Sequence, residues 1–207
     1  MAIQAVLTAD IVNSTGLGRV AEKKMIKSLR LLLQEQQFEF YRGDSFQVYV
    51  KEAGAALRLA LLCRTAAIYI AEAEAEVSSD IRISIGIGTV KMPVTTPGTG
   101  KGDAFVLSGR AFDELAINDT RLAIASNNIL AGLGLQVIAD YINAIFKNMT
   151  GKQAVVIFEL LKGGTQQTVA AKLKKSKSTV HQHVTAGRWP EIEKLLLQYE
   201  NIIHQLS

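Results

Sequence analysis

Two aspartates occupy positions where carboxylates are suited to binding a divalent cation. Asp10 closes a short apolar run, and Asp44 lies in a turn between two further apolar runs. If the first strand pairs with the hairpin that contains this turn, both carboxylates reach the same end of a sheet. Paired carboxylates beside a helix N-terminus near Ser14 suit Mg²⁺ or Mn²⁺ bound together with a phosphate. The alternative is that both aspartates serve only as cap and turn residues.

A second group of residues with recognisable chemistry lies at positions 165–184. Five apolar positions there fit two short helices that meet at a tight turn: Val169, Ala170, Leu173, Val180 and Val184. Small Ala170 lets the helices cross closely, and Val180 fills the gap between them. Lys174 takes the turn position where glycine is common, at a cost of about 1 kcal/mol. The spacing is that of a helix-turn-helix unit.

The second helix of this unit presents side chains suited to a DNA duplex. Hydroxyl, amide and imidazole groups suit base edges, and lysines suit phosphates. The candidate DNA-binding residues are Lys175, Lys177, Ser178, Thr179, Gln182, His183 and Arg188. Double-stranded DNA is therefore the first predicted partner, with a protein-interaction module as the alternative.

The distribution of charge supports the same prediction. Residues 1–150 carry 15 basic and 15 acidic side chains, whereas residues 151–207 carry 8 basic and 4 acidic ones, so the net charge of +4 lies entirely in the last segment. Positive charge of this kind drives sequence-independent DNA binding, although a solvated lysine-rich surface has the same composition.

Composition favours a packed protein of the cytoplasm. The hydrophobic fraction of 48% is enough for a core. The single cysteine, Cys63, is expected to be a small buried side chain in a reducing compartment. No secretory signal is evident, and charges such as Arg58, Arg64 and Asp140 interrupt the apolar stretches, so no membrane segment is predicted.

Hydrophobic periodicity predicts the elements that position these residues. Strands are expected over 3–9, 38–41, 46–50, 80–90 and 121–125, and helices from a cap at Ser14 or Thr15 to 36, over 53–76 and over 103–118. This order, βαββαβ with one helix and one strand appended, predicts an α+β fold with a ferredoxin-like sheet and helices on one face. The nearly apolar helix over 53–76 is expected to be largely covered.

The remainder of the chain is predicted to be helical. A connecting helix capped by Asn127 runs over 127–147, a second over 153–161, and a last one begins near Pro190 after the two-helix unit. The predicted domains are thus a sheet domain (1–126), a connecting helix (127–149) and an all-α helix-turn-helix domain (150–207).

The phrases at residues 10–15, 43–46, 82–88 and 102–110 (DIVNST, GDSF, RISIGIG and GDAFVLSGR) resemble four blocks of class III nucleotide cyclase domains, in the same order. The resemblance implies metal binding by Asp10 and Asp44, and nucleotide contacts by Gly43, Ser45 and the transition-state arginine Arg110. Two polar residues of the family correspond to Phe40 and Val106 here. The resemblance therefore implies a degenerate domain without cyclase activity.

The whole chain also resembles the bacterial SatD family, through the phrases at residues 42–47, 82–88 and 104–109. This resemblance implies the same domain arrangement and a role in transcriptional regulation. The favoured hypothesis is a DNA-binding regulator with a cyclase-like sensory and dimerisation domain, expected to be a homodimer and to respond to a nucleotide effector. The alternative hypothesis is an enzyme that binds or processes nucleotides with a metal held by Asp10 and Asp44.

Overall fold

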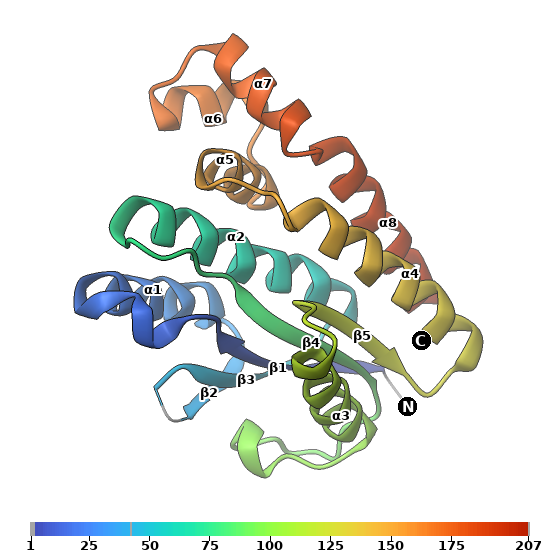
Figure 1. The fold of residues 1–207 in the computed structure, drawn as a ribbon. Helices are drawn as coiled ribbons and strands as arrows, with labels where there is room; N and C mark the ends of the chain where they lie inside the picture. Colours follow the sequence, from blue (N-terminus) through green and yellow to red (C-terminus); the bar gives the residue numbers. More distant parts are fainter. Residues whose placement is uncertain (1–2, 42, 207) are drawn as a thin grey trace.

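The computed structural model describes residues 3–41 and 43–206, so Arg42, the first residue of one SatD-like phrase, lies outside it. Within these residues the chain forms a mixed α+β fold with one five-stranded sheet (Figure 1). The strands are β1 (Gln4–Ile11), β2 (Gln37–Tyr41), β3 (Ser45–Val50), β4 (Ile81–Gly88) and β5 (Leu122–Ser126). The helices are α1 (Gly18–Leu33), α2 (Ala56–Glu74), α3 (Asp103–Ile117), α4 (Ile129–Phe146), α5 (Gly151–Leu161), α6 (Gln166–Leu173), α7 (Lys177–Ala186) and α8 (Trp189–Leu206).

The strands lie in the order β2-β3-β1-β4-β5, with β1 at the centre. Every neighbouring pair is antiparallel except β4 and β5, which are parallel. The predicted succession of strands and helices is confirmed, including the hairpin of β2 and β3 and the appended α3 and β5.

Helices cover both faces of the sheet, and the prediction that they share one face is wrong. Ala5, Leu7 and Ala9 of β1 face the core beneath α1 and α2, whereas Val6 faces the smaller cluster beneath α3. The α3 backbone lies so close to β4 that a Cβ at Gly86 would come within 2.2 Å of the Ala104 carbonyl oxygen. In Figure 1, α3 lies below the sheet and α2 above it.

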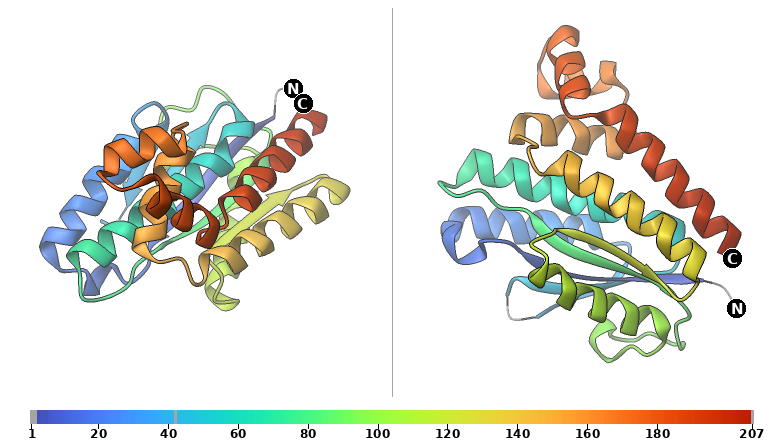
Figure 2. Two further views of the ribbon diagram at one scale, coloured as in Figure 1. Left: turned by 90° about the horizontal axis from the view of Figure 1, so that it is seen from above. Right: turned by 45° about the vertical axis from the view of Figure 1, so that its right-hand side comes forward.

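The C-terminal helices extend the core beyond α2. Because α2 is apolar nearly all round, it packs on the sheet with one side and on α5 with the other, as its composition predicted. Buried residues of α4, α5 and α8 belong to the same cluster as those of the sheet. In addition, the buried hydroxyl of Tyr199 in α8 donates to the Ala53 carbonyl, 2.8 Å away, just before α2. Both views of Figure 2 place α4 alongside β5 and α8.

Two predicted helix caps are corrected by the structure. Asn128, and not Asn127, caps α4, since its side chain accepts from the amide of Ala131. Neither Ser14 nor Thr15 caps α1; residues 14–16 form a short 3₁₀ turn, and α1 begins at Gly18 without a side-chain cap. The Ser14 hydroxyl is engaged elsewhere, as described below.

Cys63 is fully buried in α2, as predicted, and burial raises the pKa of its thiol to about 12. Two helical segments, Ala53–Glu74 and Ile129–Phe146, are long and apolar enough to span a bilayer. Two-thirds of the first is buried inside the protein, which is typical of a core helix, whereas only a third of the second is buried.

Candidate functional site

The predicted acidic site lies where β1 ends beside the β2–β3 turn. Asp10 is paired with Ser45 on one side and with Arg82 on the other. Asp44 immediately precedes β3, and its Oδ2 accepts a hydrogen bond from the Ser14 hydroxyl at 2.6 Å. The structure thus brings both aspartates to one end of the sheet.

The charge on Asp10 is unfavourable in this position. Burial raises the pKa of its carboxyl, and the nearby negative charge of Asp44 raises it further, against the opposing effect of Arg82. The Arg82 guanidinium lies 3.8 Å from Asp10 Oδ2. Within the part of the chain that the structure describes, Asp10 Oδ1 and Arg82 Nε are buried without a hydrogen-bond partner. A cation bound here would be coordinated by Oδ1, and its positive charge would lower the pKa of the Asp10 carboxyl.

Arg110 lies on α3, the helix that covers the face of the sheet opposite α1 and α2. Hydrogen bonds tie the helix to the sheet two residues earlier: the Ser108 hydroxyl accepts from Thr8 at 3.0 Å, and its carbonyl accepts from Ser84 at 2.7 Å. Arg110 itself is exposed. Gly43 is exposed at φ +91°, next to Asp44 in the turn.

Phe40 and Val106 do not add polar groups to this site. The Phe40 ring packs against Phe46, and the Arg30 guanidinium of α1 lies 4.7 Å from its centroid. Phe40 therefore belongs to the α1 side of the sheet, whereas Val106 lies about half exposed on α3.

The oxygen atoms at this site are of the kind that binds a hard cation, but the side chains that supply them are few. Two carboxylates and the hydroxyls of Ser14 and Ser45 supply oxygen ligands, which Mg²⁺ and Mn²⁺ prefer. Among the described residues, no three His, Cys, Asp or Glu side chains gather into a metal-binding group. A cation held by Asp10 and Asp44 would thus have to complete its shell with water or phosphate oxygens, as Mg²⁺ commonly does.

The two helices of the predicted DNA-reading unit are α6 and α7. Thr165 caps α6 with a reciprocal capping box, and Ser176 caps α7. Lys174 between them adopts the left-handed conformation, φ 52°, as the sequence predicted for that position. Val180 and Val184 are buried and hold α7 against the preceding helices.

The structure divides the seven candidate DNA-binding residues into three groups. Lys175, Lys177, Ser178 and Gln182 are exposed. Lys175 lies in the turn before α7 and Lys177 is its first residue, while Ser178 and Gln182 lie on the side of α7 away from its buried valines. Thr179 and His183 are partly covered: Thr179 shares a hydrogen bond with Ser176, and burial lowers the pKa of the His183 imidazole.

Arg188 is engaged with other parts of the protein. Its Nε donates to Glu191, and a terminal nitrogen donates to the Tyr141 hydroxyl at 2.6 Å. The guanidinium also lies over the Tyr141 ring. These contacts connect the start of α8 to α4, and a DNA contact by Arg188 stays a prediction.

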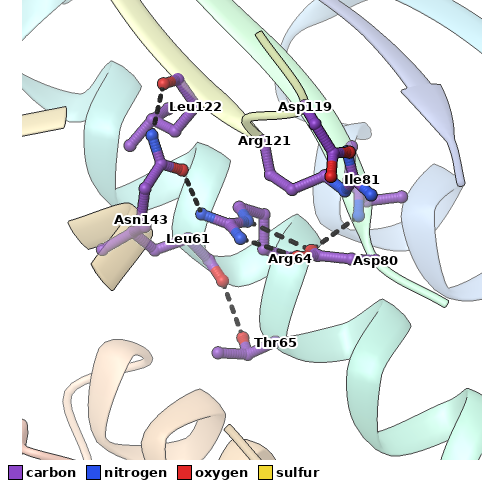
Figure 3. A network of polar contacts seen from close by, with 9 residues as sticks. All are labelled: Leu61, Arg64, Thr65, Asp80, Ile81, Asp119, Arg121, Leu122 and Asn143. Atoms are coloured by element: carbon purple, nitrogen blue, oxygen red, sulfur yellow. Dashed lines mark hydrogen bonds and ion pairs between the residues drawn. The ribbon is translucent and has the colours of Figure 1, made fainter. Parts of the chain in front are cut away.

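A buried ion pair that the sequence did not reveal joins α2 to the residue just before β4 (Figure 3). Both of its members line a cleft between α2 and α4. Arg64, only 1% exposed, donates to both carboxylate oxygens of Asp80, at 3.1 and 2.6 Å. The guanidinium also contacts the Asn143 amide oxygen at 3.5 Å and the Phe146 ring. The cleft has a volume of about 850 Å³. No spacing in the sequence brings Arg64, Asp80 and Asn143 together; only an unexplained arginine in an apolar helix hints at a partner.

No protein-family model matches this chain, and no curated protein is similar to it. Two solved structures of a bacterial light-regulated adenylyl cyclase resemble it, each with 14% sequence identity and a TM-score of 0.43. One match covers 59% of this chain and 75% of the cyclase chain, and the other covers 60% and 43%. The resemblance to SatD proteins rests on the sequence phrases alone.

Proposed function

We propose that this chain is a cytoplasmic, DNA-binding transcriptional regulator in which α6 and α7 form a helix-turn-helix unit. The observation that carries the proposal is the two-sided character of α7. Val180 and Val184 anchor it, while Lys177, Ser178 and Gln182 remain free to reach a major groove. Lysines at the turn supply phosphate contacts.

In this proposal the chain divides as its sequence predicts. Residues 1–126 form a ferredoxin-like, cyclase-like sensory domain, and residues 150–207 form the DNA-binding domain. Residues 127–149 connect the two. Because α2 and α5 share one continuous core, the sheet domain and the helix-turn-helix unit are rigidly connected in this proposal. A conformational change at the sheet would then move α6 and α7.

Replacing Lys177 and Gln182 together by alanine is expected to abolish sequence-specific DNA binding. Loss of one phosphate contact lowers the salt dependence of log K by about 0.9, and a lost glutamine–base contact costs about 1–3 kcal/mol. The measurement is fluorescence anisotropy with a duplex selected from a random-sequence pool by the wild-type protein, titrated at several salt concentrations.

The matched control removes the same side-chain types from the exposed surface of α1 and its end, Lys27→Ala with Gln34→Ala. This control should bind the selected duplex as the wild type does. Wild-type affinity in the α7 variant, or failure of the wild type to enrich any duplex, would refute the proposed function.

The unpaired Asp10 oxygen favours a second candidate function, the binding of a nucleotide with Mg²⁺ or Mn²⁺. Asp10 and Asp44 would hold the cation, and Gly43, Ser45 and Arg110 would contact the nucleotide. Phe40 and Val106 argue against cyclase chemistry, so we propose the site as a sensor.

A nucleoside triphosphate with Mn²⁺ is expected to raise the melting temperature in this second case. A ligand at a hundredfold its Kd adds about 2.7 kcal/mol, which corresponds to several degrees for a chain of this size. The measurement is differential scanning fluorimetry with ATP, GTP, CTP and UTP, each with and without Mn²⁺.

Asp10→Asn should lose this shift, whereas Glu193→Gln, on the exposed surface of α8, should keep it. An absent shift for all four nucleotides would leave Asp10 and Asp44 without a nucleotide-binding role and would exclude the second candidate.

A further inference from the structure

The outer face of α4 is an apolar surface that the monomer leaves bare. Leu130, Leu133, Val137 and Tyr141 are between 40% and 81% exposed, and their spacing of three to four residues places them in one stripe. Ile129 extends the stripe at its N-terminal end, also exposed. The opposite side of the helix is buried against β5 and α8.

The size of this stripe is that of an interaction surface. Soluble monomers rarely expose contiguous apolar patches larger than a few hundred Å², and five large side chains in one row reach that range. A stable dimer buries about 800 Å² on each partner. The stripe, together with its polar rim of Gln136 and Asp140, provides the centre of such an interface.

The charges on α4 indicate what covers it. Asp140 is the single charged residue between Ile129 and Phe146. A helix that lies on a membrane surface needs lysines or arginines along its polar face, and α4 has none. The stripe therefore fits an apolar protein surface better than a lipid headgroup layer.

A second copy of the same helix complements this face when the two run antiparallel. If the two-fold axis crosses the middle of the stripe, Leu130 lies opposite Tyr141 of the partner subunit, and Leu133 lies near the partner's Val137. Asp140 then lies beside the first turn of the partner helix, where the helix dipole favours a carboxylate. A parallel arrangement would instead place the two Asp140 carboxylates together.

We infer that this chain forms a two-fold homodimer through the outer face of α4, with the two α4 helices antiparallel. Such an interface is isologous, as in most soluble dimers. Tyr141 contacts Arg188 at the α7–α8 junction, so this dimer interface lies next to the proposed helix-turn-helix unit. Helix-turn-helix proteins commonly bind two DNA half-sites as dimers, and this reason for dimerisation rests on the proposed function. The exposed α4 surface does not depend on it.

The test measures the mass of the full chain by light scattering at micromolar concentration. The wild type is expected at twice the chain mass of 22.5 kDa, and Leu133→Glu with Val137→Glu at the single mass, with unchanged circular dichroism. The matched control, Val20→Glu with Leu31→Glu on α1, replaces residues that are 71% and 57% exposed and should stay dimeric.

A second variant tests the antiparallel geometry. Asp140→Lys places a positive charge at the partner's helix N-terminus twice in the dimer, which should raise the dissociation constant roughly tenfold. A change of less than twofold would overturn the antiparallel arrangement.

A monomeric wild type would overturn the inference, as would a dimer that survives the double glutamate substitution. A monomer that co-sediments with phosphatidylcholine–phosphatidylglycerol vesicles would assign the stripe to a membrane instead. A dimer that binds no DNA would refute the proposed function and leave this interface standing.

Discussion

Asp80→Ala is expected to lower the free energy of unfolding by about 3–5 kcal/mol, because it leaves the Arg64 guanidinium buried without a counter-charge. Arg64 is only 1% exposed, and its other neighbours, the Asn143 amide and the Phe146 ring, carry no counter-charge. Urea denaturation followed by circular dichroism measures the loss.

The structure offers a matched control in the exposed ion pair of Asp119 with Arg121, in which the Asp119 side chain is 90% exposed. Asp119→Asn removes the charge and suits the left-handed φ of 48° at this position, so it should cost no more than about 1 kcal/mol. Combining Asp80→Ala with Arg64→Met should recover much of the lost stability, since no unpaired charge then remains. Equal losses for Asp80→Ala and Asp119→Asn would contradict the role assigned to the buried pair.

Two glycine-to-alanine substitutions are expected to change stability in opposite directions. A methyl group at Gly86 of β4 would lie 2.2 Å from the Ala104 oxygen and 2.5 Å from the Ser108 nitrogen, both backbone atoms of α3. The helix would have to move away, at a cost of about 1–3 kcal/mol or more. The same methyl group at Gly109 meets no atom of the described residues within 4 Å, so alanine should stabilise α3 by about 0.5–1 kcal/mol.

The measurement is again the free energy of unfolding in urea, with the melting temperature as a second readout. Gly109→Ala is the internal control, because it makes the same change on the helix that Gly86→Ala displaces. A neutral Gly86→Ala would mean that α3 sits less closely on β4 than the structure indicates.

The strands and helices were largely predictable because their periodicity is local. The alternation of Ile81, Ile83, Ile85 and Ile87 with small or polar residues identifies β4, and Val180 with Val184 identifies the buried side of α7. These patterns depend only on which residues face a core, and the sequence shows this directly.

The position of α3 was not predictable from the same patterns. Successive right-handed crossovers in one direction along a sheet would place α2 and α3 on the same face. Here α3 lies on the opposite face, where Ser84, Gly86 and Gly88 of β4 leave room for its backbone. The sequence shows these small residues but not which helix approaches them.

The candidate site was partly predictable for a related reason. Asp10 and Asp44 come to the same end of the sheet because β1 pairs with β3, which follows from the predicted hairpin. Arg82 of β4 lies opposite Asp10 on β1. The sequence could not reveal this pairing, because it depends on the register between two strands that are far apart in the chain. Arg64 was interpreted as a charge that interrupts an apolar stretch, because Asp80, sixteen residues away, has no sequence signal as its partner.

The position of α2 between the sheet and α5 has a consequence for biosynthesis. A ribosome releases the sheet and α2 well before α5 and α8, so the outer flank of α2 emerges without its cover. Nascent chains in this state expose hydrophobic surface that is prone to aggregate, and they are typical clients of chaperones. Truncations that end before α5 should therefore accumulate as insoluble material, however stable the sheet itself is.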